Sequence, residues 1–254
     1  RALVPQNVAA GERSLYACSG CHDDGHVDGR LHPAKQNRFL SMTKTCRSIG
    51  NTAPYLFLGE VADVEGFAAN LLSTHAQGTD RYSTTLRLRG GQLKTLRPQA
   101  IRAAMAAYLA NIPSEPSPFL PLHATELPAE ARHGLALFKR ACARCHRLVG
   151  DSARDDAVND AELEKRLLRG EVALTSGLLY DVGTKVLGRG GNNPPSLRGV
   201  WDNAPYFSDG SAKTLEEALS RSTLEPASKT VHGQGLPGLD GESRAALLAF
   251  LRCL

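Results

Sequence analysis

The sequence has few aromatic residues, and it contains no long uninterrupted apolar segment. Aromatic side chains make up 6% of the 254 residues, whereas there are 24 glycines and 14 prolines. This balance predicts helices joined by long irregular connections rather than a sheet-rich fold. Because no segment approaches the roughly 18 apolar residues of a membrane helix, we expect no membrane span.

Charge of one sign is not concentrated anywhere along the chain. The 30 Lys and Arg residues and the 26 Asp and Glu residues are interspersed and give a formal net charge of +4. No cluster resembles a nucleic-acid footprint, so nucleic acid is not an expected partner. The sequence opens at Arg1 without the pattern of a signal peptide, so we expect any export signal to have been removed or to lie outside this segment.

Two cysteine motifs carry the strongest chemical signal. Each C-x-x-C pair is followed at once by histidine, in Cys18-Ser19-Gly20-Cys21-His22 and in Cys142-Ala143-Arg144-Cys145-His146. This is the attachment signature of c-type haem. Two thiols on one turn reach the two vinyl groups of a porphyrin, and the adjacent histidine ligates the iron. A zinc site or a redox dithiol would use the cysteine pairs but leaves both histidines unexplained.

The sequence therefore predicts two covalently bound c-type haems. A calcium ion is left open as a further cofactor. The expected attachment residues and iron ligands are Cys18, Cys21, His22, Cys142, Cys145 and His146.

Segments around the two motifs recur along the chain. The Ala-Pro-Tyr sequence at 53–55 matches 204–206, and a glycine and a glutamate that follow each copy keep the same offset of 151 residues. Each half also closes with an alanine-rich helix, at 103–109 and 245–251. Repeated units of this kind indicate duplication of one domain.

We predict a mainly α fold of two tandem cytochrome c-like domains, each with one covalently attached haem. The expected boundaries are 1–112, a semi-rigid Pro-rich linker at 113–124, and 125–254. The second half holds a longer insert at about 149–191. This insert either wraps the haem or the interface between the domains, or forms a solvated surface excursion.

The second half resembles bacterial dihaem cytochrome c peroxidases and the MauG superfamily. The resemblance lies in Asn193-Pro194-Pro195-Ser196-Leu197-Arg198-Gly199-Val200 and in the run Ala204-Pro205-Tyr206-Phe207-Ser208-Asp209-Gly210. The first half resembles the superfamily more loosely, through 21–29 and 53–55. The resemblance implies an oxidising, periplasmic or otherwise extracytoplasmic location. It also implies a first haem that binds hydrogen peroxide and a second that relays electrons from a redox partner, which is a cytochrome, a cupredoxin or a protein side chain.

The resemblance also implies a general acid–base group near the first iron. Glu65 lies nearest the position of the family's glutamate, with Glu60 as a weaker candidate, and Tyr55 falls where the family often has a polar glutamine. Two departures stand out. The second half has no methionine to serve as an iron ligand, and the lone Trp201 does not match the tryptophan commonly placed between the haems.

Histidines are the first candidates for the opposite face of each iron, because imidazole is a strong ligand. His232 follows the Thr-Leu-Glu-Glu segment on a Gly-flanked loop, and His75 has a similar place in the first half. Tyr206 is the next suspect for the second iron. A solvent-exposed loop is the alternative for both histidines.

The two remaining cysteines leave three alternatives open. Cys46 and Cys253 could form a disulfide, stay as free thiols, or supply a Cys46 thiolate to the first iron. Three functions correspond to these observations. They are a peroxidase-like oxidoreductase, an electron-transfer module with two six-coordinate haems, and a sulfur-compound oxidoreductase that uses Cys46.

Because both attachment motifs are complete, the denatured holoprotein should be heavier than the polypeptide by two haems. Intact-mass spectrometry checks this. A mass increase of one haem, or bound zinc in place of haem, would contradict the prediction.

Overall fold

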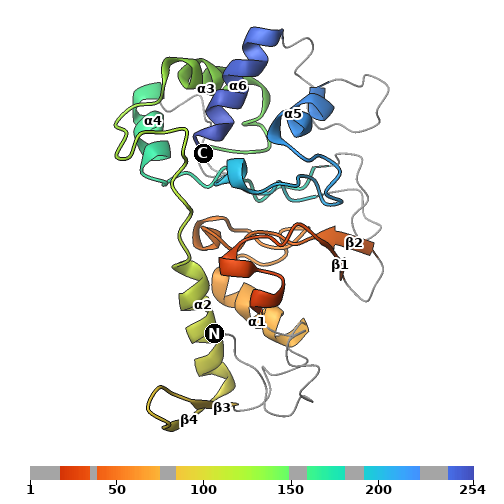
Figure 1. Ribbon diagram of the computed structural model, residues 1–254, viewed down its shortest axis with the longest axis vertical. Coiled ribbons are helices and arrows are strands. Elements are labelled where there is room, and N and C mark those ends of the chain that lie inside the picture. Colours follow the sequence, from red (N-terminus) through yellow and green to blue (C-terminus); the bar gives the residue numbers. More distant parts are fainter. Residues whose placement is uncertain (1–17, 35–38, 75–83, 149–158, 181–191, 224–239) are drawn as a thin grey trace.

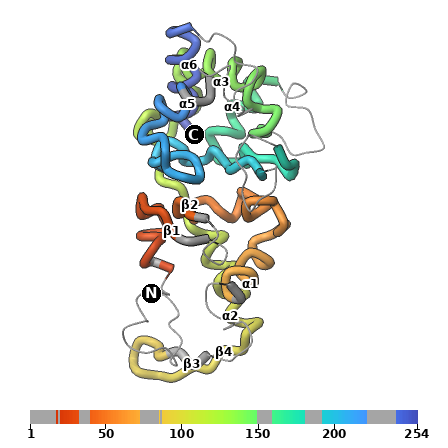
Figure 2. The backbone as a smooth tube through the Cα atoms, turned by 90° about the vertical axis from the view of Figure 1, so that its right-hand side faces the viewer, coloured from red at the N-terminus to blue at the C-terminus, as the bar shows by residue number. Residues whose placement is uncertain are grey.

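The computed structural model describes residues 18–34, 39–74, 84–148, 159–180, 192–223 and 240–254. Figures 1 and 2 show two halves stacked along the long axis, with the N-terminal half at one end and the C-terminal half at the other. The helices are α1 Val64–Thr74, α2 Pro98–Ala110, α3 Ala129–Ala141, α4 Asp160–Leu168, α5 Leu215–Thr223 and α6 Gly241–Arg252. The strands form two antiparallel hairpins, β1 Leu31–Ala34 with β2 Phe39–Met42 and β3 Thr84–Arg87 with β4 Leu93–Leu96. The mainly helical fold is confirmed.

Helix boundaries follow local capping signals. The Asn159 side chain accepts from the Glu162 N–H at the start of α4, and the Asp240 side chain accepts from the Ser243 N–H at the start of α6. Both side chains satisfy N–H groups that the helix itself leaves free. In α3 the basic residues Lys139 and Arg140 occupy the last turn, where they oppose the negative end of the helix dipole.

The core of the C-terminal half is the crossing of α3 and α6. Phe138 and Phe250 are fully buried there, with ring centroids 5.1 Å apart. Gly134 lets the two backbones approach closely, since a Cβ at this position would meet the Ala246 carbonyl. The core is therefore organised by one contact that only glycine permits.

The N-terminal half has its own smaller core, in which α1 packs on α2. Its buried members are Ile49, Tyr55, Ala68, Ala106 and Leu109. The Pro-rich segment 113–124, predicted as a linker, contacts both halves. The Ser114 hydroxyl lies against that of Ser48, and the Ser117 hydroxyl donates to the Arg252 carbonyl at 2.5 Å.

Each half contains the same turn, at the offset of 151 residues that the sequence predicted. In the first copy the Tyr55 N–H donates to the Val61 carbonyl and the Tyr55 hydroxyl donates to the Ile49 carbonyl. In the second copy Tyr206 makes the equivalent bonds to Ala212 and Val200. The tyrosine fastens the turn to the short 3-10 helix before it, Ile49–Asn51 or Val200–Asp202.

The two copies face each other across the interface between the halves. The Met42 N–H donates to the Ser208 carbonyl at 2.8 Å, and the Asn193 N–H donates to the Phe57 carbonyl at 2.7 Å. These bonds are equivalent, because 193 and 208 are the counterparts of 42 and 57 at the same offset. An interface in which the same patch of both partners makes reciprocal contacts is isologous, as in a two-fold dimer.

The described part of the predicted insert belongs to the core. Leu163 of α4 is fully buried, and Val172 and Leu174 are nearly so, all in the cluster around α3 and α6. Residues 159–176 are therefore not a solvated surface excursion.

The α3–α6 crossing gives a test of the fold. Gly134→Ala should destabilise the protein by about 1–3 kcal/mol, because the clash with the Ala246 carbonyl outweighs the gain in helix propensity. Gly241→Ala is the matched control, since nothing lies within 4 Å of its Cβ position, and it should be neutral or slightly stabilising. Chemical denaturation compares the two. Equal stability of both variants would contradict the close crossing.

Candidate haem-binding sites

Both C-x-x-C-H motifs fold as single turns. In the first, the backbone N–H groups of Cys21 and His22 donate to the Cys18 carbonyl at 3.2 and 2.8 Å. In the second, those of Cys145 and His146 donate to the Cys142 carbonyl at 3.0 and 2.9 Å. The second motif directly follows α3, which ends at Ala141. Each motif thus brings two thiols and one imidazole together on one turn, as haem attachment requires.

His146 is held in the orientation of an iron ligand. Its side chain is buried, and Nδ1 lies 3.1 Å from the Pro195 carbonyl oxygen and 3.4 Å from that of Leu174. Carbonyl oxygens only accept hydrogen bonds, so Nδ1 carries the proton and the lone pair is on Nε2. An Nδ1–H bound to a carbonyl is the usual support of a metal-ligating histidine.

A small hydrogen-bonded layer holds these carbonyls in place. Segments 173–176 and 193–196 lie side by side. The Thr175 hydroxyl donates to the Pro194 carbonyl at 2.5 Å, the Ser196 hydroxyl to Ala173 at 2.6 Å, and the Asn193 side chain to Ser176 at 2.7 Å. The motif quoted for the family resemblance therefore has a structural task, which is to position the acceptor for His146.

His22 is held differently. Its Nδ1 lies 3.4 Å from the Sγ of Cys46, and burial raises the pKa of that thiol to about 12. When a histidine binds iron through Nε2, Nδ1 points away from the metal, so Cys46 lies behind His22 rather than across the iron. Thiolate ligation of the opposite face, one of the three alternatives for Cys46, does not fit this geometry.

The disulfide alternative is also wrong. Cys46 packs in the core of the N-terminal half and Cys253 against that of the C-terminal half, and both are free thiols. The sequence could show that two cysteines remained, but it carries no signal for their separation in space.

Burial also affects the thiols of the second motif. Burial, reinforced by neighbouring Cys145, raises the pKa of Cys142 to about 12, and burial raises the pKa of Cys145 as well. The residues of both motifs fit covalently bound haem.

The predicted catalytic residues lie in different environments. Glu65 is exposed in the first turn of α1, and Glu60 is exposed as well. Tyr55 is 5% exposed, stacks on Phe67 with ring centroids 4.9 Å apart, and donates its hydroxyl to Ile49. His75 and His232, the predicted opposite-face ligands, lie outside the described residues.

Tyr206, the next candidate ligand for the second iron, has its hydroxyl hydrogen-bonded in the same way as Tyr55. Its hydroxyl donates to the Val200 carbonyl at 2.7 Å. Burial, with nearby Glu216 and Asp202, raises its pKa to about 12. A tyrosinate ligand at this position would require the turn to open and the phenol to lose its proton.

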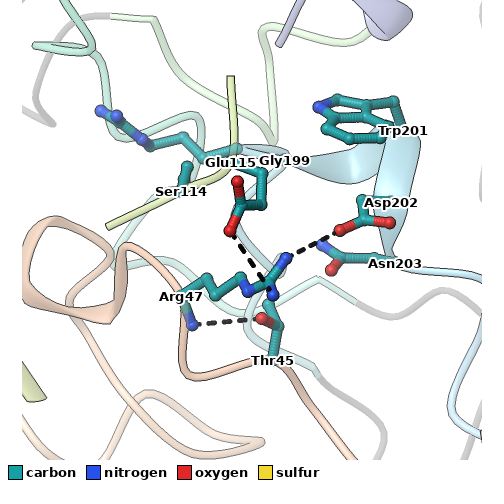
Figure 3. Close-up of a pocket in the computed structure, with 9 residues that line it drawn as sticks. Thr45, Arg47, Ser114, Glu115, Gly199, Trp201, Asp202 and Asn203 are labelled. Atoms are coloured by element: carbon teal, nitrogen blue, oxygen red, sulfur yellow. Dashed lines mark hydrogen bonds and ion pairs between the residues drawn. The ribbon is translucent and has the colours of Figure 1, made fainter. Parts of the chain in front are cut away.

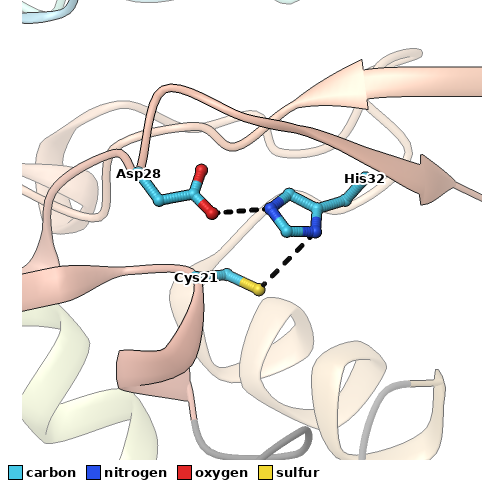
Figure 4. A group of neighbouring side chains, drawn as sticks. All are labelled: Cys21, Asp28 and His32. Carbon is cyan, nitrogen blue, oxygen red and sulfur yellow. Dashed lines mark hydrogen bonds and ion pairs between the residues drawn. The ribbon is translucent and has the colours of Figure 1, made fainter.

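A histidine beside the first motif forms a compact group with two partners (Figure 4). Nε2 of His32 lies 2.6 Å from a carboxylate oxygen of Asp28, and Nδ1 lies 3.9 Å from the Sγ of Cys21. Burial alone would raise the pKa of Asp28, but hydrogen bonds from the Arg30 N–H, His32 and Thr43 together lower it. Within the described residues this is the sole group of three such ligands, and its one carboxylate is not the oxygen-rich donor set that calcium prefers.

An ion-pair network closes the interface between the halves (Figure 3). Arg47 lies 3.0 Å from Asp202 and 3.7 Å from Glu115, and His26 Nε2 lies 3.2 Å from the same Asp202. Arg47, Glu115 and Asp202 line a small pocket that Trp201 also borders. The indole N–H of Trp201 is buried without a hydrogen-bond partner among the described residues. His26 therefore contributes to the interface, whereas His123 and His133 are exposed.

Comparisons with known proteins agree with this geometry. Residues 131–254 match the family model described as cytochrome c. A domain of this kind implies covalently bound c-type haem, in agreement with the second motif at 142–146. No curated protein matches the sequence. None of the helices within the described ranges has the length and apolar character needed to cross a membrane.

Two solved structures share the fold over nearly the whole chain. Hydrazine synthase of Kuenenia stuttgartiensis has a TM-score of 0.58 at 16% identity and covers 99% of this chain and 84% of that chain. A MauG-like protein associated with microbial copper homeostasis has a TM-score of 0.57 at 20% identity, covering 100% and 93%. At these identities the likeness concerns the fold. The fold expected from the resemblance to MauG-like proteins is thus shared over the whole chain.

Arg47 tests whether the interface network couples the halves. Arg47→Met should cost about 1–3 kcal/mol of unfolding free energy, because it removes a charged hydrogen bond from half-buried Asp202. Arg166→Met is the control, since its i,i+4 pairing with Glu162, in which both side chains are about 42% exposed, should contribute less than about 1 kcal/mol. A double-mutant cycle with Asp202→Asn should give a coupling above roughly 0.5 kcal/mol. A coupling of zero would contradict the pairing.

Proposed function

We propose that the chain is a dihaem c-type cytochrome that acts as a peroxidase-like oxidoreductase, using hydrogen peroxide to oxidise a partner cytochrome, cupredoxin or protein side chain. The first haem is held by Cys18, Cys21 and His22. The second is held by Cys142, Cys145 and His146. We place this activity in the periplasm or another extracytoplasmic compartment, with no nucleic acid partner.

The observation that carries the proposal is the duplicated arrangement around the two motifs. Both histidines sit on a one-turn attachment motif, and both have an Nδ1 partner behind them, Cys46 for His22 and Pro195 for His146. A lone fortuitous C-x-x-C-H would have no reason to acquire such support. The MauG-like fold over the full chain adds to this argument.

The residues around the sites would have distinct tasks. Haem supplies the redox chemistry of iron, and the protein decides which irons are open to small molecules. His232 is proposed as the opposite-face ligand of the second iron. His75 has the corresponding place at the first iron, where its coordination would give the electron-transfer module with two six-coordinate haems instead. For the peroxidase-like function, Glu65 is proposed as the group that moves a proton near an open first iron. Its exposed place at the start of α1 would let it exchange protons with solvent.

Tyr55 favours the second candidate function, a non-enzymatic electron-transfer module with two six-coordinate haems. The phenol is buried and its hydroxyl is bound to a backbone carbonyl of its own turn. Tyr206 makes the same bond in the other half. The shared role of the two tyrosines is thus structural, which leaves the first site with one fewer polar group for peroxide chemistry.

A sulfur-compound oxidoreductase is disfavoured by the position of Cys46. That function would need the thiol on the open face of the first iron. The contact of Cys46 with His22 Nδ1 places it on the opposite side.

The coordination of the two irons separates the candidates. For the peroxidase-like function, the EPR spectrum of the ferric holoprotein should show one high-spin and one low-spin haem, and hydrogen peroxide should change the optical spectrum of the high-spin haem. His232→Gly should turn the low-spin haem high-spin without loss of covalent haem, because it removes a strong ligand.

His123→Gly is the control, since His123 is exposed and is not a predicted iron ligand, and the spectrum of this variant should equal that of the wild type. Two low-spin haems that do not react with peroxide would support the electron-transfer module instead. An unchanged spectrum of His232→Gly would overturn the ligand assignment.

A further inference from the structure

The two proximal histidines differ in the chemistry of their Nδ1 partners. For His146 the partners are the carbonyl oxygens of Pro195 and Leu174, at 3.1 and 3.4 Å. For His22 the partner is a thiol sulfur, that of Cys46, at 3.4 Å. The partner of His22 is thus a side-chain atom, whereas the partners of His146 are backbone atoms.

The fold does not impose a thiol at this position. At the offset of 151 residues the counterpart of Cys46 is Leu197, which packs against the core of the C-terminal half. The first half therefore has a polarisable, hydrogen-bonding atom where the second half has hydrocarbon. Leucine at position 46 would satisfy the packing alone.

The position of the Cys46 sulfur is fixed by its backbone. The Cys46 N–H donates to the Gly25 carbonyl at 2.8 Å, and the Cys46 carbonyl accepts from the Ile49 N–H at 3.3 Å. Gly25 lies three residues after His22, so this bond ties Cys46 to the loop that leaves the attachment motif. The two backbone hydrogen bonds of Cys46 thus hold its thiol beside the Nδ1 edge of the His22 imidazole.

The identity of the acceptor affects the electronic character of the ligand. An acceptor that pulls on Nδ1–H makes the imidazole a stronger donor to iron, which stabilises the ferric state and lowers the reduction potential. A carbonyl oxygen is a strong acceptor, whereas a thiol sulfur is a weak one. The imidazole of His22 should therefore be the weaker donor of the two.

We propose that Cys46 is a positioning residue for His22, and that its weak hydrogen bond to Nδ1 orients this ligand while keeping the first iron more oxidising than a carbonyl partner would. This inference rests on the proposed function, because it requires haem at the first motif. It adds that the hydrogen bond between Cys46 and His22 Nδ1 contributes to the direction of electron flow, from the second haem to the first.

The test uses the dihaem holoprotein and two replacements that differ in acceptor strength. Cys46→Ser replaces sulfur with a stronger oxygen acceptor, so the potential of the first haem should fall. Cys46→Val keeps the approximate shape and removes the acceptor, so the potential should rise. Cys253→Ser is the matched control, since it replaces a half-buried thiol of the other half and should shift neither haem. Potentiometric titration followed by the optical spectrum measures each haem.

Resonance Raman spectroscopy provides a readout that is independent of activity and stability. The iron–histidine stretch of the ferrous first haem should move to higher frequency in Cys46→Ser and to lower frequency in Cys46→Val. The bands of the second haem should stay unchanged. If Cys46→Val does not fold, the Ser variant and the control decide the question.

Two kinds of failure can be told apart. If the wild-type protein has no haem at the first motif, the proposed function fails, and the intact mass shows it. If the wild type carries both haems but the Ser and Val variants leave the potential and stretch of the first haem unchanged, Cys46 does not act on His22 and the inference is overturned. Loss of covalent haem from Cys46→Ser would also overturn it, because Cys46 would then be needed for attachment.

Discussion

Two reciprocal backbone hydrogen bonds, from Met42 to Ser208 and from Asn193 to Phe57, are the constraint on which the rest of the structure depends. Each bond joins a segment of one half to the repeated turn of the other. The same segments continue to the Nδ1 partners of the histidines, since Cys46 lies four residues after Met42 and Pro195 two residues after Asn193. The interface and the orientation of both motif histidines are therefore parts of one arrangement. A shift of one half against the other would move the atoms behind His22 and His146, so close packing at the interface also fixes the sites.

Because these contacts are between backbone atoms, the side chains at equivalent positions of the two halves can differ. Met42 lies against Gly210, where a Cβ would approach its sulfur to 2.7 Å, whereas the counterpart Asn193 lies against Gly59 and donates to Ser176. One loop thus contributes an apolar contact and the other a polar one within the same frame. Arg47 reaches across to Asp202 while its counterpart Arg198 stays within its own half and donates to the Val172 carbonyl. The two sites can have different chemistry because the geometry that holds them does not depend on these side chains.

The features that could be predicted from the sequence are those carried by contiguous residues. The attachment motifs, the repeated turn and the closing helices are local patterns, and the offset of 151 residues extends to hydrogen bonds that the sequence could not display. The interface could not be predicted, because its central bonds are between backbone atoms, which leave no residue signature. Cys46 shows the same limit. Its type indicated a disulfide, a free thiol or a ligand, and only the position of its sulfur behind Nδ1 distinguishes these. The place of Tyr55 in a motif predicts a catalytic role, but the sequence could not show that Tyr55 and Tyr206 make the same hydrogen bond within the repeated turn.

The repeat therefore separates two kinds of residue in this chain. Residues whose counterparts make the same bond, such as Tyr55 and Tyr206, maintain the frame, and their replacement should act on stability in both halves alike. Residues whose counterparts differ, such as Cys46 and Leu197, do not make a bond that both halves share. A functional difference between the halves must therefore come from this second group. The first motif has such a residue, Cys46, in direct contact with His22. A functional difference between the two halves would thus require few substitutions, because each half already supplies the repeated turn and the loop that it contacts.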